Sequence, residues 1–154
     1  MRIRKATLRD GPAIHALVAD YARRGEVLPR TLSEIYETIR AWMVAEEEGQ
    51  VIGCGALVIL DADLAEVRSL AVAPAYQGNG IGRKIVEALI EEGKALGVTT
   101  VFALTRAVPF FERLGFAVTE KERFPRKIWR DCLKCSLFPH CDETAVVRTV
   151  KPYG

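Results

Sequence analysis

The stretch EVRSLAVAPAYQGNGIGRKIVEALIEEGKAL, from Glu66 to Leu96, decides the fold of this 154-residue chain. It begins with an apolar, partly β-branched run over 67–72 that is typical of a buried strand and that Pro74 ends. A Gly-rich loop over 77–82 leads directly into a run whose apolar residues recur at helical spacing. Such a loop at the start of a helix can hold phosphate, because its backbone N–H groups converge and the helix dipole favours an anion.

The spacing of the glycines excludes two familiar phosphate-binding loops. A dinucleotide-binding fold requires G-x-G-x-x-G after its first strand, whereas these glycines run G-x-G-x-G and follow two earlier strand-like segments. A P-loop requires Gly-Lys-Ser/Thr, but Gly82 is followed by Arg83 and Lys84. The loop therefore indicates a different phosphate-bearing ligand.

The stretch resembles the acetyl-CoA site of the GNAT N-acetyltransferases, whose pattern is Gln/Arg-x-x-Gly-x-Gly/Ala after a central strand. Gln77, Gly80 and Gly82 match the loop, and Leu-Ala-Val-x-Pro over 70–74 matches the strand. The resemblance implies an α/β GNAT fold, with a single twisted mixed sheet of about six or seven strands flanked by helices. It also implies acetyl-CoA as cosubstrate. The residues expected to bind it are Leu70, Ala71, Val72, Gln77, Gly78, Asn79, Gly80, Ile81, Gly82, Arg83 and Phe111.

Length and charge bound the remaining possibilities. The chain is predicted to be one domain over residues 1–154, which is long enough to bury a core. A net charge of +2 gives no support for binding nucleic acid or membrane by bulk electrostatics. No signal-like segment or run of transmembrane length occurs, so we expect a cytoplasmic protein. The family resemblance implies a small-molecule amino-acid substrate as the partner, and the sequence is compatible with a homodimer.

Apolar periodicity and turn residues predict the other elements. Asp10 is expected to cap the first helix. Strand alternation predicts that Glu66, Arg68 and Leu70 share one face of the central strand. Strands are predicted over 2–6, 42–46, 51–60, 100–104, 115–120 and 144–150, and helices over 12–24, 32–40, 83–96 and 109–114.

The run FFERLGF over 110–116 is a second point of resemblance. GNAT proteins carry a short helix and a Gly-Phe here, often with a Tyr four residues before the Gly. That Tyr commonly protonates the departing coenzyme A thiolate. Phe111 occupies the matching position and has no proton to give. The thiolate must therefore leave unassisted, through water, or with a proton from another group.

Acetylation of an amine requires a group that removes a proton, because most amines are ammonium ions at neutral pH. Glu66 is the predicted general base, acting directly or through water. A charged residue in a central strand is costly unless it lines a cavity or reaches water. The alternative is that Glu66 and Arg68 have no catalytic role and lie at the solvent-exposed end of the strand. A backbone N–H of the splayed central strand is expected to donate to the oxyanion.

Further segments resemble stand-alone N-acetylglutamate synthases: 28–30, 65–72, 104–106 and 127–132. The glutamate-contacting arginines of that family match Arg30 and Arg106, and Arg68 lies nearby. Planar, permanently charged guanidinium groups suit a dicarboxylate. The resemblance implies acetylation of the α-amine of L-glutamate, the entry step of arginine synthesis, with these three arginines binding the substrate. The alternatives are another small-amine or protein N-terminal acetyltransferase, and a non-catalytic acyl-CoA-binding regulatory module.

The segment 132–141 holds a candidate metal site made of Cys132, Cys135, His140 and Cys141. Three thiolates and an imidazole are ligands that zinc accepts. However, the spacing is tight, a second CxxC pair is missing, and adjacent His and Cys would have to bend sharply to serve one ion. A reduced, metal-free loop is the favoured interpretation.

Overall fold

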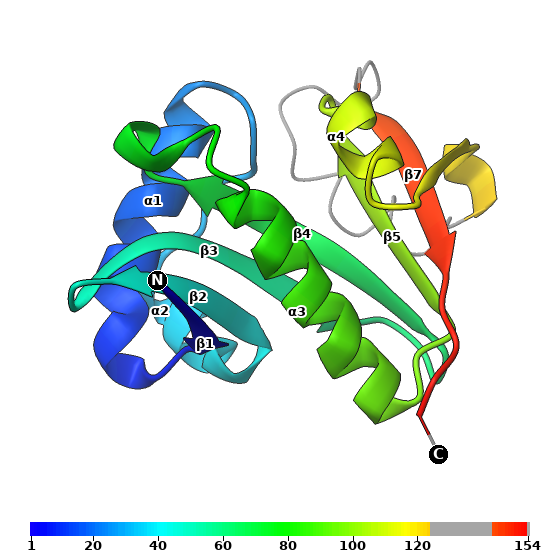
Figure 1. Ribbon diagram of the computed structural model, residues 1–154, viewed down its shortest axis with the longest axis horizontal. Helices are drawn as coiled ribbons and strands as arrows, with labels where there is room; N and C mark the ends of the chain where they lie inside the picture. Colours follow the sequence, from blue (N-terminus) through cyan, green and yellow to red (C-terminus); the bar gives the residue numbers. More distant parts are fainter. Residues whose placement is uncertain (124–142, 154) are drawn as a thin grey trace.

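The computed structural model describes residues 1–123 and 143–153. Seven strands form one mixed sheet in the order β1-β2-β3-β4-β5-β7-β6, with helices on both faces (Figure 1). This confirms the predicted fold class. The strands are β1 (Arg2–Lys5), β2 (Trp42–Glu47), β3 (Gln50–Ile59), β4 (Leu64–Val72), β5 (Thr100–Thr105), β6 (Ala117–Thr119) and β7 (Thr144–Thr149), and the helices are α1 (Gly11–Arg23), α2 (Leu32–Glu37), α3 (Ile81–Leu96) and α4 (Val108–Glu112).

The sheet opens at its centre, between β4 and β5. These strands pair in parallel where 64–66 lie against 100–102, whereas the other neighbouring strands of the described sheet pair antiparallel. Beyond Glu66, β4 continues to Val72 and β5 to Thr105 as the two strands diverge (Figure 1). The divergence leaves a wedge at the carboxyl ends of both strands.

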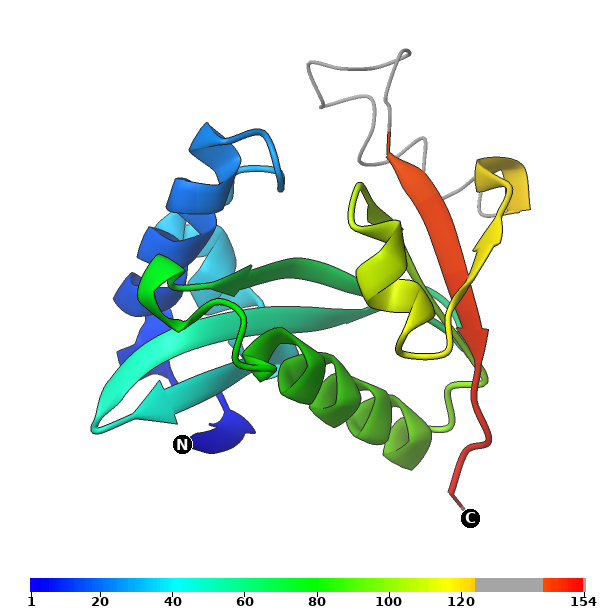
Figure 2. The ribbon, with the colours of Figure 1, turned by 45° about the horizontal axis from the view of Figure 1, so that its top comes forward.

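Helices cover the two faces of the sheet separately (Figure 2). Ile85, Val86 and Leu89 of α3 are buried in the cluster that covers one face. α1 and α2 cover the other face through Ile14 and Ile35. No described helix is long and apolar enough to span a membrane.

Glycines of β3 allow α3 to approach the sheet closely. A Cβ atom added at Gly53 or Gly55 would lie 3.0 Å from the Ile85 side chain. Because such a contact is tighter than ordinary van der Waals packing, α3 would have to move outward. These glycines therefore help fix where α3, and the loop that precedes it, lies on the sheet.

A β-bulge in β4 places Leu70 on the opposite face of the strand from Glu66 and Arg68. The prediction that these three residues share one face is therefore wrong for Leu70. Ala56 pairs with Arg68, but two residues earlier Cys54 pairs with Ala71, so β4 contains one extra residue. Ser69 adopts a φ of 56° within the bulge. Because an extra residue reverses the alternation of faces, Leu70 packs toward the α3 side, away from Glu66 and Arg68.

Asp10 occupies the N-cap position of α1, as predicted, but its side chain makes no capping hydrogen bond. Its carboxylate instead accepts two hydrogen bonds from Arg4, at 2.8 and 2.9 Å, and one from the Thr7 N–H at 2.7 Å. Arg4 also donates to Glu46 of β2 at 2.8 Å. The backbone of Asp10 is already helical, at φ −82° and ψ −10°, which directs the carboxylate back toward β1 rather than toward the helix.

Asp10→Asn is expected to lower the free energy of unfolding at pH 7 by about 1.5–3 kcal/mol, because it weakens hydrogen bonds to a charged partner. The hydrogen bonds from Arg4 lower the pKa of Asp10 below its ordinary value of 3.8. Because the folded-state pKa is lowered, the stabilisation is complete above the ordinary pKa of the unfolded chain. It is lost as the pH falls through the folded-state pKa. Urea denaturation should therefore show the two proteins converging in stability below about pH 4.

The control is Asp20→Asn, which removes the exposed ion pairs that Asp20 of α1 makes with Arg23 and Arg24. Exposed pairs of this kind contribute little, so we expect no resolvable change in stability. Equal losses in the two variants at pH 7, or a difference that does not depend on pH, would contradict the structural role of Asp10.

Candidate active site

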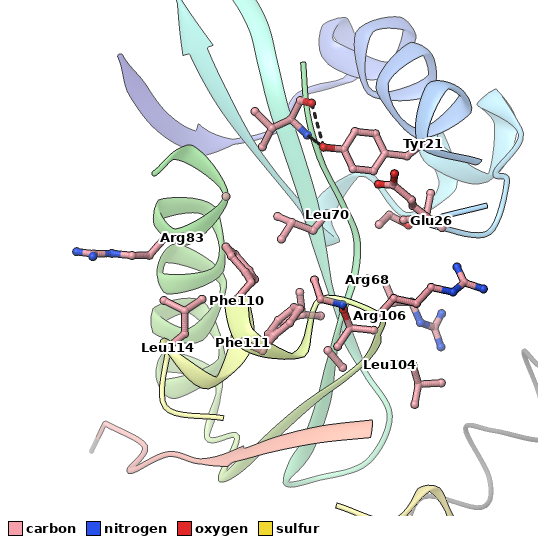
Figure 3. Close-up of a pocket in the computed structure, with 18 of the residues that line it drawn as sticks. Tyr21, Glu26, Arg68, Leu70, Arg83, Leu104, Arg106, Phe110, Phe111 and Leu114 are labelled. Atoms are coloured by element: carbon pink, nitrogen blue, oxygen red, sulfur yellow. Dashed lines mark hydrogen bonds between the residues drawn. The ribbon is translucent and has the colours of Figure 1, made fainter. Parts of the chain in front are cut away.

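The wedge between β4 and β5 contains a cavity of about 880 Å³ (Figure 3). Its walls come from β4, the Gly-rich loop with the start of α3, the end of β5, α4 and the segment after α1. The predicted site residues that line it are Arg30, Glu66, Arg68, Leu70, Val72, Gln77, Gly78, Gly80, Ile81, Gly82, Arg83, Arg106 and Phe111. One cavity thus brings together residues from distant parts of the sequence.

Two predicted cofactor-binding residues do not line this cavity. The Ala71 side chain is buried in the cluster on the α1 face, with Cys54 and Ile14. The alternation of faces along β4 after the bulge accounts for this. The Asn79 side chain donates to the Tyr76 carbonyl at 3.3 Å and so closes the loop on itself.

The Gly-rich loop presents backbone N–H groups at the start of α3. Gly78 and Gly80 adopt left-handed conformations, with φ of 84° and 75°, which residues with a side chain rarely adopt. Gly80 is the N-cap, and its carbonyl accepts the N–H of Lys84. The N–H groups of 81–83 have no carbonyl of their own helix to bind. Together with the helix dipole, they make this end of the cavity suited to phosphate.

Arg83 lies at the mouth of this end, with its guanidinium directed away from the cavity (Figure 3). Its Nε atom lies 3.5 Å from Glu87 Oε1, one helical turn along α3. In this conformation the charge of Arg83 does not point into the cavity.

Tyr21 of α1 is a cavity residue that sequence reasoning missed. Its hydroxyl accepts the Val72 N–H and donates to the Val72 carbonyl, both at 3.1 Å (Figure 3). It also accepts a hydrogen bond from Gln77 Nε2 at 3.0 Å. Tyr21 thereby joins α1, the end of β4 and the Gly-rich loop. The pattern of α1 shows only that Tyr21 faces inward, because its partner Val72 is 51 residues away.

Phe111 forms part of an apolar wall of the cavity. It is 5% exposed, and its ring meets those of Phe110 and Phe116 edge-on, with centroids 5.1 Å apart in both pairs. Figure 3 places Phe110 and Phe111 next to α3 and away from the ends of the arginine side chains. This wall is apolar and offers no proton to a leaving thiolate.

Glu66 and the arginines form the charged part of the cavity. Glu66 is 3% exposed, and Arg68 Nε donates a hydrogen bond to Glu66 Oε1. Burial lowers the pKa of Arg30, and the positive charge of Arg68 lowers it further. Arg30 nevertheless stays charged at neutral pH, because the guanidinium group ionises far above it. Two cations in a partly buried space favour an anion between them.

Arg106 follows β5 and bridges the mouth of the cavity. Its Nη1 donates to the Gly25 carbonyl, in the segment after α1 that leads to Arg30. Arg68 and Arg106 extend toward the same side of the cavity (Figure 3). Arg106 is predicted to bind the substrate, and the structure adds a contact with the segment that carries Arg30.

The candidate zinc ligands Cys132, Cys135, His140 and Cys141, and the resembling segment 127–132, lie outside the described residues. Within residues 1–123 and 143–153, no group of three or more His, Cys, Asp or Glu side chains could hold a metal ion. Cys54 is buried there with a free thiol, and burial raises its pKa to about 12. Such a thiol stays protonated at neutral pH and is not a nucleophile.

Comparison with known sequences gives consistent matches. The profile of the Acetyltransferase (GNAT) family matches residues 12–116. The chain is 45% identical over 148 residues to an uncharacterized N-acetyltransferase of Chlorobaculum tepidum, and the aligned region covers 96% of each protein. It is 42% identical over 121 residues to the amino-acid acetyltransferase of Mycobacterium tuberculosis, and this aligned region covers 77% of the chain and 69% of that protein.

Solved structures give the same picture. A Mycobacterium tuberculosis protein in complex with CoA and NLQ matches with a TM-score of 0.85 and 34% identity, over 97% of this chain and 99% of the other. The N-acetylglutamate synthase of Neisseria gonorrhoeae, complexed with coenzyme A and N-acetyl-glutamate, matches with a TM-score of 0.87 and 27% identity. That match covers 96% of this chain and 34% of the synthase, so the chain spans about a third of its length.

Proposed function

This chain belongs to the acetyltransferase (GNAT) family, and from that premise we propose that it transfers the acetyl group of acetyl-CoA to the α-amine of L-glutamate. It is an N-acetyltransferase, and its relatives include a protein named amino-acid acetyltransferase. Acetyl-CoA is the cosubstrate, in accord with the CoA held by both matching structures. N-acetylglutamate is the expected product, and the synthesis of arginine is the route that we propose for it.

One observation carries the proposal: the same cavity joins the Gly-rich loop over 77–82 to a buried glutamate and to arginines. The loop of 77–82 would hold the pyrophosphate, and the open edge of β4 would lie along the rest of the cosubstrate. Arg30 and Arg106 would hold the carboxylates of the acceptor. Glu66 would then lie at the place where the amine meets the thioester.

The residues divide the chemistry among them. Glu66 accepts a proton from the ammonium group, directly or through one water, and the freed nitrogen lone pair attacks the thioester carbon. A backbone N–H of β4 donates to the oxyanion that forms. The C–S bond then breaks as the nitrogen gives up its second proton to water. The departing thiolate takes a proton from water in its turn, since Phe111 has none to give.

Product analysis tests this function as a whole. The protein, acetyl-CoA and L-glutamate should yield N-acetylglutamate and free coenzyme A in equal amounts, measured by mass spectrometry and by thiol titration. Release of coenzyme A without N-acetylglutamate would overturn the assignment of the acceptor. Absence of both products would overturn the activity.

Gly80→Asp is expected to weaken acetyl-CoA binding by at least about tenfold. A side chain at a φ of 75° costs about 1 kcal/mol or more, and a carboxylate at the N-terminus of α3 repels phosphate. Isothermal titration calorimetry gives the dissociation constant directly.

The matched control is Gly49→Asp in the turn between β2 and β3. Gly49 has a φ of 80°, and both glycines have open space around the position of a Cβ atom. The two variants therefore carry the same backbone strain and the same charge, but only position 80 lies in the cavity. Equal dissociation constants for the two variants would show that the phosphate site lies elsewhere.

A further inference from the structure

We propose that Tyr21 is a positioning residue for acetyl-CoA, because its hydroxyl holds the Gly-rich loop against the end of β4 through the Gln77 side chain. In this role the Gln77 side chain supports the loop and does not itself contact phosphate. The proposal rests on the cosubstrate of the proposed function, acetyl-CoA, and not on the identity of the acceptor.

The end of β4 has an open edge on the side of β5. Pairing of the two strands ends at Glu66 and Phe102, well before Val72. On the other side, the Ala73 N–H donates to the Ile52 carbonyl of β3 at 2.8 Å. Because alternate residues of a strand pair with opposite neighbours, the N–H and C=O groups of Val72 point to the open edge. Val72 is 8% exposed, and backbone groups in such a position require partners.

The Tyr21 hydroxyl takes the place of the missing strand (Figure 3). It accepts the Val72 N–H and donates to the Val72 carbonyl, both at 3.1 Å. It also accepts a hydrogen bond from Gln77 Nε2 at 3.0 Å, and the same nitrogen donates to the Val72 carbonyl at 3.2 Å. A hydroxyl has one donor and two acceptor sites, and an amide nitrogen has two donors. All of these sites are in use, so the three residues form a closed network.

The Gly-rich loop has few other contacts that fix its position. A Cβ atom at Gly78 or Gly80 would have nothing within 4 Å, and the Asn79 side chain donates within the same turn. Of the side chains at 77–80, all of which the structure describes, that of Gln77 alone forms hydrogen bonds to other elements. The position of the loop relative to β4 therefore depends on Gln77 and on the hydroxyl that holds it.

The ring of Tyr21 is held in turn by its own helix. The Arg24 guanidinium lies 4.5 Å from the centre of the ring and pairs with Asp20 at 2.8 Å. A guanidinium over an aromatic ring is attracted to it. α1 covers the opposite face of the sheet from α3. Tyr21 thus connects the loop that precedes α3 to a helix of the other layer.

This connection prepares the loop for the cosubstrate. The N–H groups at the start of α3 bind a phosphate well when the loop already holds them in place, because the cosubstrate then does not have to order the loop as it binds. Along the chain, Val72 lies between Glu66 and the loop, and all three line the cavity. The network therefore also fixes the phosphate end of the site relative to the end at which the thioester reacts.

A double-mutant cycle tests this role with the parent protein, Tyr21→Phe, Gln77→Met and the double variant. Both substitutions keep the approximate size of the side chain and remove its hydrogen-bonding group. Isothermal titration calorimetry with acetyl-CoA, without any acceptor, gives the dissociation constants. We expect each single variant to bind roughly fivefold or more weakly, which is the net contribution of about one hydrogen bond. The double variant should bind at most about twofold more weakly than the weaker single variant, because both substitutions remove the same support.

The alternatives give different results. A larger loss in the double variant, up to the roughly twenty-five-fold of two independent effects, would show that Gln77 contacts the cosubstrate directly and would overturn the proposal. An unchanged dissociation constant in either single variant would also overturn it, because that side chain would then be merely structural. Tighter binding by Tyr21→Phe would mean that the hydroxyl competes with acetyl-CoA for the backbone of Val72, which contradicts a supporting role.

Tyr36→Phe is the control, because Tyr36 of α2 is 38% exposed and does not line this cavity. It should bind acetyl-CoA as the parent does. Gln77 is exposed, so Gln77→Met leaves the core intact and tests the proposal even if Tyr21→Phe is unstable. Failure of the parent to bind acetyl-CoA would overturn the proposed function together with this proposal. Otherwise the calorimetry judges the positioning alone, whereas product analysis with L-glutamate judges the acceptor.

Discussion

Glu66→Gln lowers kcat for L-glutamate by about a hundredfold or more at pH 7, which is the range that a positioned general base contributes. The substitution keeps the size and shape of a side chain that is 3% exposed but removes its ability to accept a proton. The loss should be greatest at low pH, where little free amine exists, and should shrink as the amine deprotonates by itself. The affinity for acetyl-CoA should stay the same.

Glu26→Gln is the control for this prediction. Glu26 also lines the cavity, but it is exposed and lies 3.6 Å from Arg24. It should leave the pH–rate profile as it is in the parent. If Glu66→Gln also shows the parent profile, Glu66 does not act as the base.

Arg30→Ala is expected to lower kcat/KM for L-glutamate by about thirtyfold or more. Leaving a charge without its partner where water is excluded costs about 2–5 kcal/mol, and about 1.4 kcal/mol corresponds to a factor of ten. The effect should appear mainly in KM for glutamate, with KM for acetyl-CoA unchanged. Arg30→Lys should recover only part of the loss, because a single ammonium replaces the two-pronged guanidinium.

Arg106→Ala should produce a similar loss, with an additional part from releasing the Gly25 carbonyl. Arg23→Ala is the control, because the Arg23 side chain is 71% exposed and does not line the cavity. Steady-state kinetics with both substrates varied will separate the KM values. If Arg30→Ala and Arg106→Ala both use glutamate as well as the parent does, these arginines do not hold its carboxylates.

The sequence predicted those features that depend on local patterns. Pro74, the glycines of the loop over 77–82 and the helical spacing that follows act on their immediate neighbours, and the structure shows them as expected. The approximate ends of the strands could be predicted for the same reason. α2 was predicted to continue to Arg40 but ends at Glu37. The Thr38 hydroxyl donates to the Glu34 carbonyl and accepts from the Trp42 indole N–H, which turns the chain into β2.

The remaining features depend on contacts between distant residues. The bulge at Ser69 arises from how β3 and β4 pair, and the apolar pattern of β4 alone gives no sign of it. The contact between Arg4 and Glu46 joins residues 42 apart in sequence. The direct pairing of Arg68 with Glu66 was also not predicted, although both were identified as site residues. Propensity and spacing do not show which of several acceptors a charged side chain chooses.

The central claim is most directly tested by kcat/KM for acetyl transfer to L-glutamate, L-glutamine and propylamine, measured under identical conditions with saturating acetyl-CoA. The arrangement of Arg30, Arg68 and Arg106 predicts that L-glutamate is the best acceptor. It should exceed propylamine by about thirtyfold or more, which corresponds to the lower limit for pairing a buried carboxylate. L-glutamine, which keeps the α-carboxylate and loses the second, should lie between the two. A propylamine value equal to or above that of L-glutamate would contradict the account.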